Sequence, residues 1–148
     1  MADFNFVTPR LAVGAAVTSS ADVDQLASAG ITLVIDCRAE FDDAPLLASH
    51  PAVAYVWNGV ADDDQSKPDS WFAKGIEAAL GEIAKPGRKV YCHCSAGINR
   101  GPSMAYAVMR ALGFSASDAE ECIRTARPYV GLSYRADADR AVVNLGYA

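Results

Sequence analysis

The sequence has few of the features that direct a protein to a membrane, to an oxidising compartment or to nucleic acid. None of its apolar runs approaches the roughly 20 residues that a membrane-spanning helix needs. The first five residues lack the basic flank and apolar stretch of a secretory signal, so we expect a cytoplasmic protein whose four cysteines are free thiols. A net charge of −5 argues against broad nucleic-acid binding, because phosphate backbones repel a negative surface. Nucleic acid is therefore an unexpected partner, although one local basic pocket is compatible with this charge.

The chain of 148 residues has the length of one ordinary domain, so we expect residues 1–148 to fold around a single core. Strand-like runs at 11–13, 31–36, 53–56 and 89–93 alternate with segments of helical pattern. The helical segments are 19–30, 40–49, a stretch that ends at Pro86, 101–112, and two helices that begin near Ser115 or Ser117 and near Ser133. This alternation predicts one compact α/β domain with a central, mostly parallel twisted sheet flanked by helices.

A loop is predicted from Asn58 to Ser70, between a strand and a helix. It contains the acidic run 62–64 and Pro68, and Asp69 or Ser70 is expected to cap the helix that follows. The apolar positions of that helix repeat at helical spacing, at Phe72, Ile76, Leu80 and Ile83.

A second loop, from His93 to Arg100, joins a predicted strand to a predicted helix. Successive backbone N–H groups in such a loop can converge on an anion at the positive end of the helix. The same N–H groups would stabilise a thiolate on Cys94 at the start of the loop, which makes Cys94 a candidate nucleophile. Six positions later, Arg100 offers a planar fork of donors that can bind two phosphoryl oxygens. The pattern therefore predicts a cysteine nucleophile and an arginine clamp around a bound phosphate.

This loop resembles the signature of the protein tyrosine phosphatase superfamily, which is His-Cys, five residues and then Arg. The short chain is similar to the dual-specificity branch, and the similarity covers roughly residues 10–145, including landmarks at 30–36, 87–90 and Arg127-Pro128. The resemblance implies a metal-independent hydrolase without a cofactor, which acts on phosphorylated protein, with phosphotyrosine as the first expected substrate, through a phosphocysteine intermediate. It also implies that phosphate is bound by Arg100 and the loop residues Ser95, Ala96, Gly97, Ile98 and Asn99, and that His93 orders the loop and supports the thiolate.

The leaving group of such a reaction must be protonated, and a carboxylic acid on a neighbouring loop is an efficient donor. Asp62, Asp63 and Asp64 are the candidates. In the family that this chain resembles, the acid lies about thirty residues before the cysteine and nine before an aromatic that opens the next helix. Asp62 lies 32 positions before Cys94 and 9 before Trp71, so Asp62 is the expected general acid and Asp63 the next candidate.

Two positions depart from the family pattern. Gly101 stands where most members have a serine or threonine that assists breakdown of the phosphocysteine, and Ser103 is expected to point elsewhere on the helix. Asn99 resembles the RNA 5′-triphosphatase branch of the superfamily. These departures keep two alternatives open, an RNA 5′-phosphatase and a phosphate-binding pseudophosphatase. A rhodanese-like sulfur carrier is a third, although the six-position step to Arg100 fits phosphate better.

The remaining cysteines have no assigned chemistry. In some lipid phosphatases of the superfamily a cysteine placed like Cys37 forms a reversible disulfide with the nucleophile, whereas a buried, inert thiol is the simpler interpretation. Cys37, Cys92, His93 and Cys94 lack the paired spacing of structural zinc sites, so no metal is expected. We expect Cys122 to pack in the core.

Four charged side chains outside the loop also need an interpretation. The stretch with Arg38 and Glu40 resembles one that ties the core together in prokaryotic-type tyrosine phosphatases, so both are expected to be structural. Arg124 and Arg127 could line the pocket rim, although arginines on exposed helical faces are mostly solvated.

Overall fold

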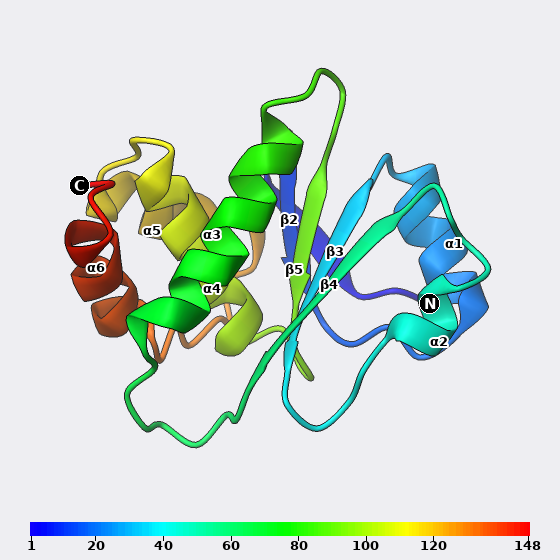
Figure 1. Ribbon diagram of the computed structural model, residues 1–148, viewed down its shortest axis with the longest axis horizontal. Coiled ribbons are helices and arrows are strands. Elements are labelled where there is room, and N and C mark those ends of the chain that lie inside the picture. Colours follow the sequence, from blue (N-terminus) through cyan, green and yellow to red (C-terminus); the bar gives the residue numbers. More distant parts are fainter.

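The computed structural model describes residues 1–148 as one five-stranded sheet with helices on both faces (Figure 1). The order of the strands in the sheet is β1-β2-β5-β3-β4. Only β1 runs antiparallel to its neighbour, and the other pairs are parallel. The strands are β1 (Phe4–Thr8), β2 (Leu11–Gly14), β3 (Leu33–Arg38), β4 (Ala54–Val60) and β5 (Val90–His93). The predicted α/β class with a mostly parallel sheet is confirmed.

Each central strand is buried on both faces, because helices cover the sheet from both sides (Figure 1). Along β2, Leu11 and Val13 face one core while Ala12 faces the other, and the same alternation runs along β3 and β5. On one side lie α1 (Ser20–Ser28) and α2 (Ala44–Leu47). On the other side lie α3 (Asp69–Ile83), α4 (Arg100–Ala111), α5 (Ala116–Ala126) and α6 (Arg135–Asn144). No helix combines the length and the apolar character that crossing a bilayer requires.

Several predicted boundaries are wrong, each for an identifiable reason. The strand β1 was not predicted, because it is short, lies at an edge of the sheet and has only one buried residue, Val7. The loop predicted from Asn58 begins at residue 61 instead, since β4 continues to Val60 through its pairing with β3. The helix predicted at 40–49 is a single turn. Neither Asp69 nor Ser70 caps α3, because the N-cap position is Pro68 and both residues lie inside the helix.

Parallel pairing brings the carboxyl ends of β2, β5, β3 and β4 to the same end of the sheet. Gly14 and Asp36 both lie beside His93, and Arg38 lies beside Val60. The loops that follow β3 and β4 leave from this end, shown at the bottom of Figure 1. Side chains at the open carboxyl ends of parallel strands are well placed to form a binding site.

Candidate active site

Cys94 is the first residue after β5, and only 2% of it is exposed. Its backbone N–H donates to the Gly14 carbonyl at the end of β2, at 3.3 Å. The next residue is fixed in the same way, because Ala16 N–H donates to the Ser95 carbonyl at 3.0 Å. The start of the loop is therefore attached to the neighbouring strand before it reaches α4.

All the loop carbonyls from Ser95 to Ile98 accept hydrogen bonds from outside the loop. The Ile98 carbonyl accepts from Gly131 N–H at 2.9 Å and from Leu132 N–H at 3.3 Å. The backbone N–H groups of residues 95–99, by contrast, donate to no protein atom. Carbonyls held outward and free N–H groups leave a cradle of donors at the N-terminus of α4, which is the arrangement that binds a phosphate.

Arg127 holds the outer side of this loop. The side chain is fully buried and donates from Nε to the Gly97 carbonyl at 2.9 Å and from Nη2 to the Ala96 carbonyl at 3.0 Å. The rest of the guanidinium pairs with the carboxylate of Asp3 and with Asn5. The expectation of a rim or solvated arginine is therefore wrong for Arg127. The Arg-Pro landmark was the sequence signal for this position.

Gly97 is required by both its conformation and its surroundings. Its φ of +70° lies in the left-handed region that favours glycine. A Cβ at this position would lie 2.5 Å from the backbone of Gly14 and 2.6 Å from Arg127 Nη2. A side chain here would thus separate the loop from the strand and from the arginine that hold it.

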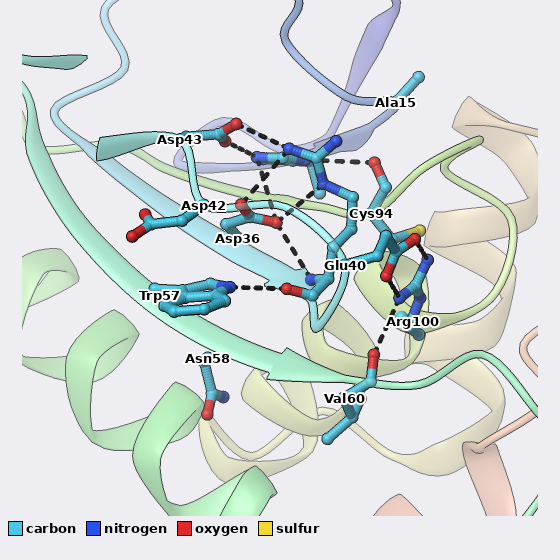
Figure 2. A network of polar contacts seen from close by, with 12 residues as sticks. Ala15, Asp36, Glu40, Asp42, Asp43, Trp57, Asn58, Val60, Cys94 and Arg100 are labelled. Carbon is cyan, nitrogen blue, oxygen red and sulfur yellow. Dashed lines mark hydrogen bonds and ion pairs between the residues drawn. The ribbon is translucent and has the colours of Figure 1, made fainter. Parts of the chain in front are cut away.

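Arg100, at the first position of α4, is buried with 2% of its surface exposed. Its two terminal nitrogens donate to the carboxylate of Glu40 at 2.6 and 2.9 Å, and Nη1 also donates to the Val60 carbonyl at 2.8 Å (Figure 2). Its Nε is buried and has no partner. Because Glu40 occupies the far edge of the guanidinium, the edge that contains Nε is left for a ligand.

Three acidic groups, Glu40, Cys94 and Asp62, interact electrostatically with Arg100. Hydrogen bonding to Glu40 raises the pKa of Arg100, and the negative charges of Cys94 and Asp62 act in the same direction. The same hydrogen bond lowers the pKa of Glu40 to about 2, so this carboxylate stays ionised. Glu40 was expected to be structural only. Its contact with Arg100, across 60 positions of sequence, orients the side chain that the sequence predicts as the phosphate clamp.

The three aspartates of the β4–α3 loop have different partners. Asp62 is exposed, and its Oδ1 accepts a hydrogen bond from the Tyr134 hydroxyl at 2.8 Å. Burial, together with the hydrogen bond to Asp62, raises the pKa of Tyr134 to about 12. Asp63 pairs with Lys67 at 2.6 Å, and this hydrogen bond lowers the pKa of Asp63. Asp64 meets Tyr134 only through its backbone N–H.

These contacts separate the three candidates for the general acid. A proton donor must carry its proton at the working pH, which the pairing with Lys67 opposes in Asp63. Asp62 is the one whose carboxylate charge acts on Arg100. The role of Asp62 as the general acid stays a prediction.

Close packing explains why residue 101 is a glycine. A Cβ at this position would lie 3.0 Å from the Cys92 carbonyl oxygen and 3.0 Å from the Cα of His93, so α4 approaches the end of β5 closely. The hydroxyl of Ser103 accepts a hydrogen bond from Tyr134 N–H at 3.2 Å, as expected for a side chain directed away from the loop. Neither residue replaces the missing hydroxyl. The Asn99 side chain accepts from the Ser133 hydroxyl at 2.8 Å and so connects the phosphate-binding loop to the loop before α6.

The other thiols of the site stay protonated. Burial raises the pKa of Cys37 well above its ordinary value, and burial together with the charge of Cys94 raises the pKa of Cys92 to about 12. Cys122 is half-buried against the main core, in agreement with the packing role expected for it.

A buried group of acids and histidine lies behind the loop, formed by Asp36, Asp43 and His93. The guanidinium of Arg38 donates to both carboxylates, from Nε to Asp36 at 3.1 Å and from Nη2 to Asp43 at 2.7 Å. The arrangement is therefore an ion-pair network centred on an arginine. Arg38 has the structural role that the sequence predicted.

Comparison with known proteins gives a family and a fold. The model of the dual specificity phosphatase catalytic domain matches residues 12–135. The solved structure of human DUSP28 is similar at a TM-score of 0.78 and 22% identity, with 97% of this chain and 95% of that chain covered. A human tyrosine phosphatase-like serine/threonine/tyrosine-interacting protein is similar at a TM-score of 0.77 and 18% identity, with 98% and 99% covered.

A third solved structure, PTPMT1 in complex with PI(5)P, is similar at a TM-score of 0.77 and 17% identity, with 96% of this chain and 98% of that chain covered. A comparison with curated protein sequences gives no match. The matched family segment includes the whole loop from Cys94 to Arg100 and most of the sheet. The chain therefore belongs to the dual specificity phosphatase family of the protein tyrosine phosphatase superfamily, as its sequence predicted.

Proposed function

We propose that this protein hydrolyses phosphomonoesters of proteins, phosphotyrosine first, with Cys94 as nucleophile and without a metal ion. The observation that carries the proposal is the loop of residues 95–99 at the N-terminus of α4, whose backbone N–H groups donate to no protein atom. Arg100, at the first position of α4, adds a charged donor, Nε, that also has no protein partner. Donors fixed in advance around a phosphoryl group stabilise the charge of the transition state without further reorganisation. A reducing, cytoplasmic setting, in which Cys94 stays a thiol, is part of the proposal.

In the first step, the thiolate of Cys94 attacks phosphorus, so an S–P bond forms as the P–O bond to the leaving group breaks. The proton that the leaving oxygen needs comes from Asp62, which the Tyr134 hydroxyl holds in position. Arg100 and the loop N–H groups bind the equatorial oxygens throughout.

In the second step, water attacks the phosphocysteine, the S–P bond breaks, and Asp62 takes up a proton from the water. Because Gly101 supplies no hydroxyl, the departing sulfur has no side-chain hydroxyl donor from that position. This step is accordingly proposed to be slow relative to family members with a serine or threonine at that position.

The role of Asp62 is tested with Asp62→Asn. The variant cannot donate a proton, so we expect turnover of a phosphotyrosine peptide to fall about 10²-fold. The loss should be smaller for para-nitrophenyl phosphate, whose leaving group is stable without a proton. Steady-state kinetics with both substrates measure the difference.

The matched control for this test is Asp63→Asn on the same loop. It removes the partner of Lys67 and leaves the Tyr134 contact intact, so it should turn over both substrates at a rate close to wild type. Equal losses in the two variants, or no loss in Asp62→Asn, would remove Asp62 from the mechanism.

The charge around the loop supports the proposed substrate class. Exposed carboxylates of Glu40, Asp62, Asp63 and Asp64 border the site, whereas its cations Arg100 and Lys67 are buried and paired. Negative charge at the rim disfavours polyanions such as a triphosphate-ended RNA or a phosphoinositide in an anionic membrane. The complex of PTPMT1 with PI(5)P nevertheless makes a phosphoinositide the natural comparison substrate.

The proposal is tested by a substrate panel in the presence of EDTA. Phosphotyrosine and phosphoserine peptides, PI(5)P, and an RNA with a 5′-triphosphate are compared by kcat/KM, with thiosulfate included for the sulfur-carrier alternative. We expect the phosphotyrosine peptide to be turned over fastest. A faster reaction with RNA or PI(5)P would contradict the proposed phosphoprotein substrate and make RNA or phosphoinositide the substrate class. Phosphate binding without any turnover would establish a pseudophosphatase.

A further inference from the structure

We propose that a pocket at the edge strand of the sheet binds a glutamate side chain close to the phosphorylated residue of a peptide substrate, with Lys74 as the partner of its carboxylate. The inference rests on the proposed function, because it states which phosphopeptides the site prefers. The pocket has a volume of about 370 Å³ and is formed by Ala39, Trp57, Asn58, Gly59 and Lys74. None of these residues has a part in the proposed reaction.

The pocket lies at a bulge in β4. From Asp36 to Arg38, β3 advances by two residues. Their partners in β4 are Trp57 and Val60, which are three residues apart, so β4 has an extra residue within the segment 58–59. A bulge bends its strand and redirects side chains, and bulges are common beside active sites. Because β4 is the last strand of the sheet, no further strand covers the bulge.

The indole of Trp57 is fixed in place although it is exposed. The residue is 43% exposed, and its Nε1–H donates to the Arg38 carbonyl at 2.6 Å. A side chain that is already fixed loses little conformational entropy when a ligand binds. The two CH₂ groups of a glutamate can pack on such an apolar surface, whereas the shorter aspartate offers only one.

Lys74 supplies the positive charge of the pocket. It is exposed on α3, and its Nζ donates to the Trp57 carbonyl at 2.8 Å. An ammonium group has three N–H donors, so two remain for a ligand. Lys74 forms no ion pair with a carboxylate of the protein, in contrast to the exposed arginines Arg124 and Arg140. A carboxylate of the substrate would therefore meet an unpaired cation.

The pocket is continuous with the contacts of Arg100. Ala39 precedes Glu40, whose carboxylate binds the guanidinium of Arg100. Gly59 precedes Val60, whose carbonyl accepts from Nη1 of Arg100 at 2.8 Å. Figure 2 shows this part of β4 beside Glu40 and Arg100. Since an extended peptide advances by about 3.3–3.6 Å per residue, a side chain within about three positions of the phosphorylated residue can reach the pocket.

The surrounding charge makes the expected preference depend on position. Glu40, next to the pocket, is already paired with Arg100. Asp62 and Asp64, on the β4–α3 loop, are exposed and pair with no cation. A peptide glutamate directed toward that loop meets like charges, which disfavour binding, whereas one directed toward the pocket meets Lys74.

The inference is tested with phosphotyrosine peptides in which one glutamate is moved through the three positions on either side of the phosphotyrosine. Each peptide is compared with its glutamine counterpart, which has the same shape without the charge. We expect one placement at which glutamate raises kcat/KM about three- to fivefold over glutamine, as for an exposed ion pair. The gain should appear in KM, because the contact is remote from the reacting atoms. It should vanish in Lys74→Gln and become a penalty in Lys74→Glu.

A matched control and a direct binding readout are both present in the chain. Lys85, just beyond the other end of α3, is also exposed but lies outside the pocket, so Lys85→Gln should keep the preference. Of the two tryptophans, Trp71 is only 4% exposed, so acrylamide quenching reports mainly on Trp57. In the Cys94→Ser variant, the preferred glutamate peptide should protect Trp57 more than its glutamine counterpart does.

The outcomes separate this inference from the proposed function. Turnover without a glutamate preference, a preference that survives in Lys74→Gln, or equal quenching of Trp57 with both peptides would overturn the inference and leave the proposed function. Protection of Trp57 by the glutamate peptide without any turnover in the wild type would overturn the proposed function and leave the pocket as a binding site. A preference that is lost in Lys74→Gln and kept in Lys85→Gln, together with protection of Trp57, would support both.

Discussion

Replacing Cys94 with serine is expected to abolish turnover while phosphate binding persists. The loop donors and Arg100 do not depend on the sulfur, so the binding site should survive the Cys94→Ser change. A serine hydroxyl, however, remains protonated at neutral pH and is a weak nucleophile without an adjacent base. We expect kcat for para-nitrophenyl phosphate to fall at least about 10⁴-fold.

The result is read from two measurements on the same variant, namely steady-state turnover and calorimetric titration with a phosphotyrosine peptide. Cys122→Ser serves as the control, because it removes a half-buried thiol on α5 that lies outside the site. This control should keep both activity and binding. Turnover by Cys94→Ser within tenfold of wild type would require another nucleophile or a direct attack by water, and would contradict the proposed mechanism.

The local parts of the fold could be predicted from the sequence because they depend on neighbouring residues. Ser19 and Ser115 cap their helices as their positions indicated, and the buried strands appear as continuous apolar runs. The loop from Cys94 to Arg100 was recognisable for the same reason, since its glycine, its spacing and the helix that follows lie in one short segment. The strand β1 was missed because its pairing with β2 is a tertiary interaction with little signal in its own residues.

The support of the site could not be predicted, because it depends on which strands become neighbours. Glu40 meets Arg100 and Asp43 meets His93 only because β3 lies beside β5 in the sheet. Arg127 reaches the loop from the end of α5, and this packing also lies beyond local pattern. The residues proposed to carry the chemistry could therefore be named from the sequence, whereas those that hold them in place could not.

The supporting contacts hold the loop from two sides, which are called outer, where Arg127 lies, and inner, where His93 lies. On the outer side, Arg127 fixes the carbonyls and pairs with Asp3 of the N-terminal segment. On the inner side, His93 fixes the carbonyl of Cys94 and pairs with Asp43. Each of these side chains bonds to loop carbonyls and is itself held by a carboxylate, so the loop carbonyls are fixed while the loop N–H groups have no protein partner. Such fixed donors are what electrostatic stabilisation of a transition state requires.

The conservative change Arg100→Lys is expected to lower kcat for a phosphotyrosine peptide about 10²- to 10³-fold. Lysine keeps the positive charge but has no planar fork, so it cannot bond to Glu40 with two nitrogens and still direct a third donor at the phosphate. The lost interaction strengthens as charge spreads over the phosphoryl oxygens in the transition state. The larger effect should therefore appear in kcat rather than in KM.

Steady-state kinetics with the same peptide test this expectation, and Arg124→Lys is the matched control. Arg124 also pairs with a carboxylate, that of Glu120 at 2.8 Å, but it lies on α5 and has no contact with the loop. Its replacement should leave kcat within a factor of two or three of wild type, because a surface ion pair contributes at most about 1 kcal/mol and only to stability. If Arg100→Lys retained most of the wild-type kcat, charge alone would suffice at this position. The two-edged arrangement, with Glu40 on one edge and phosphate on the other, would then have no part in catalysis.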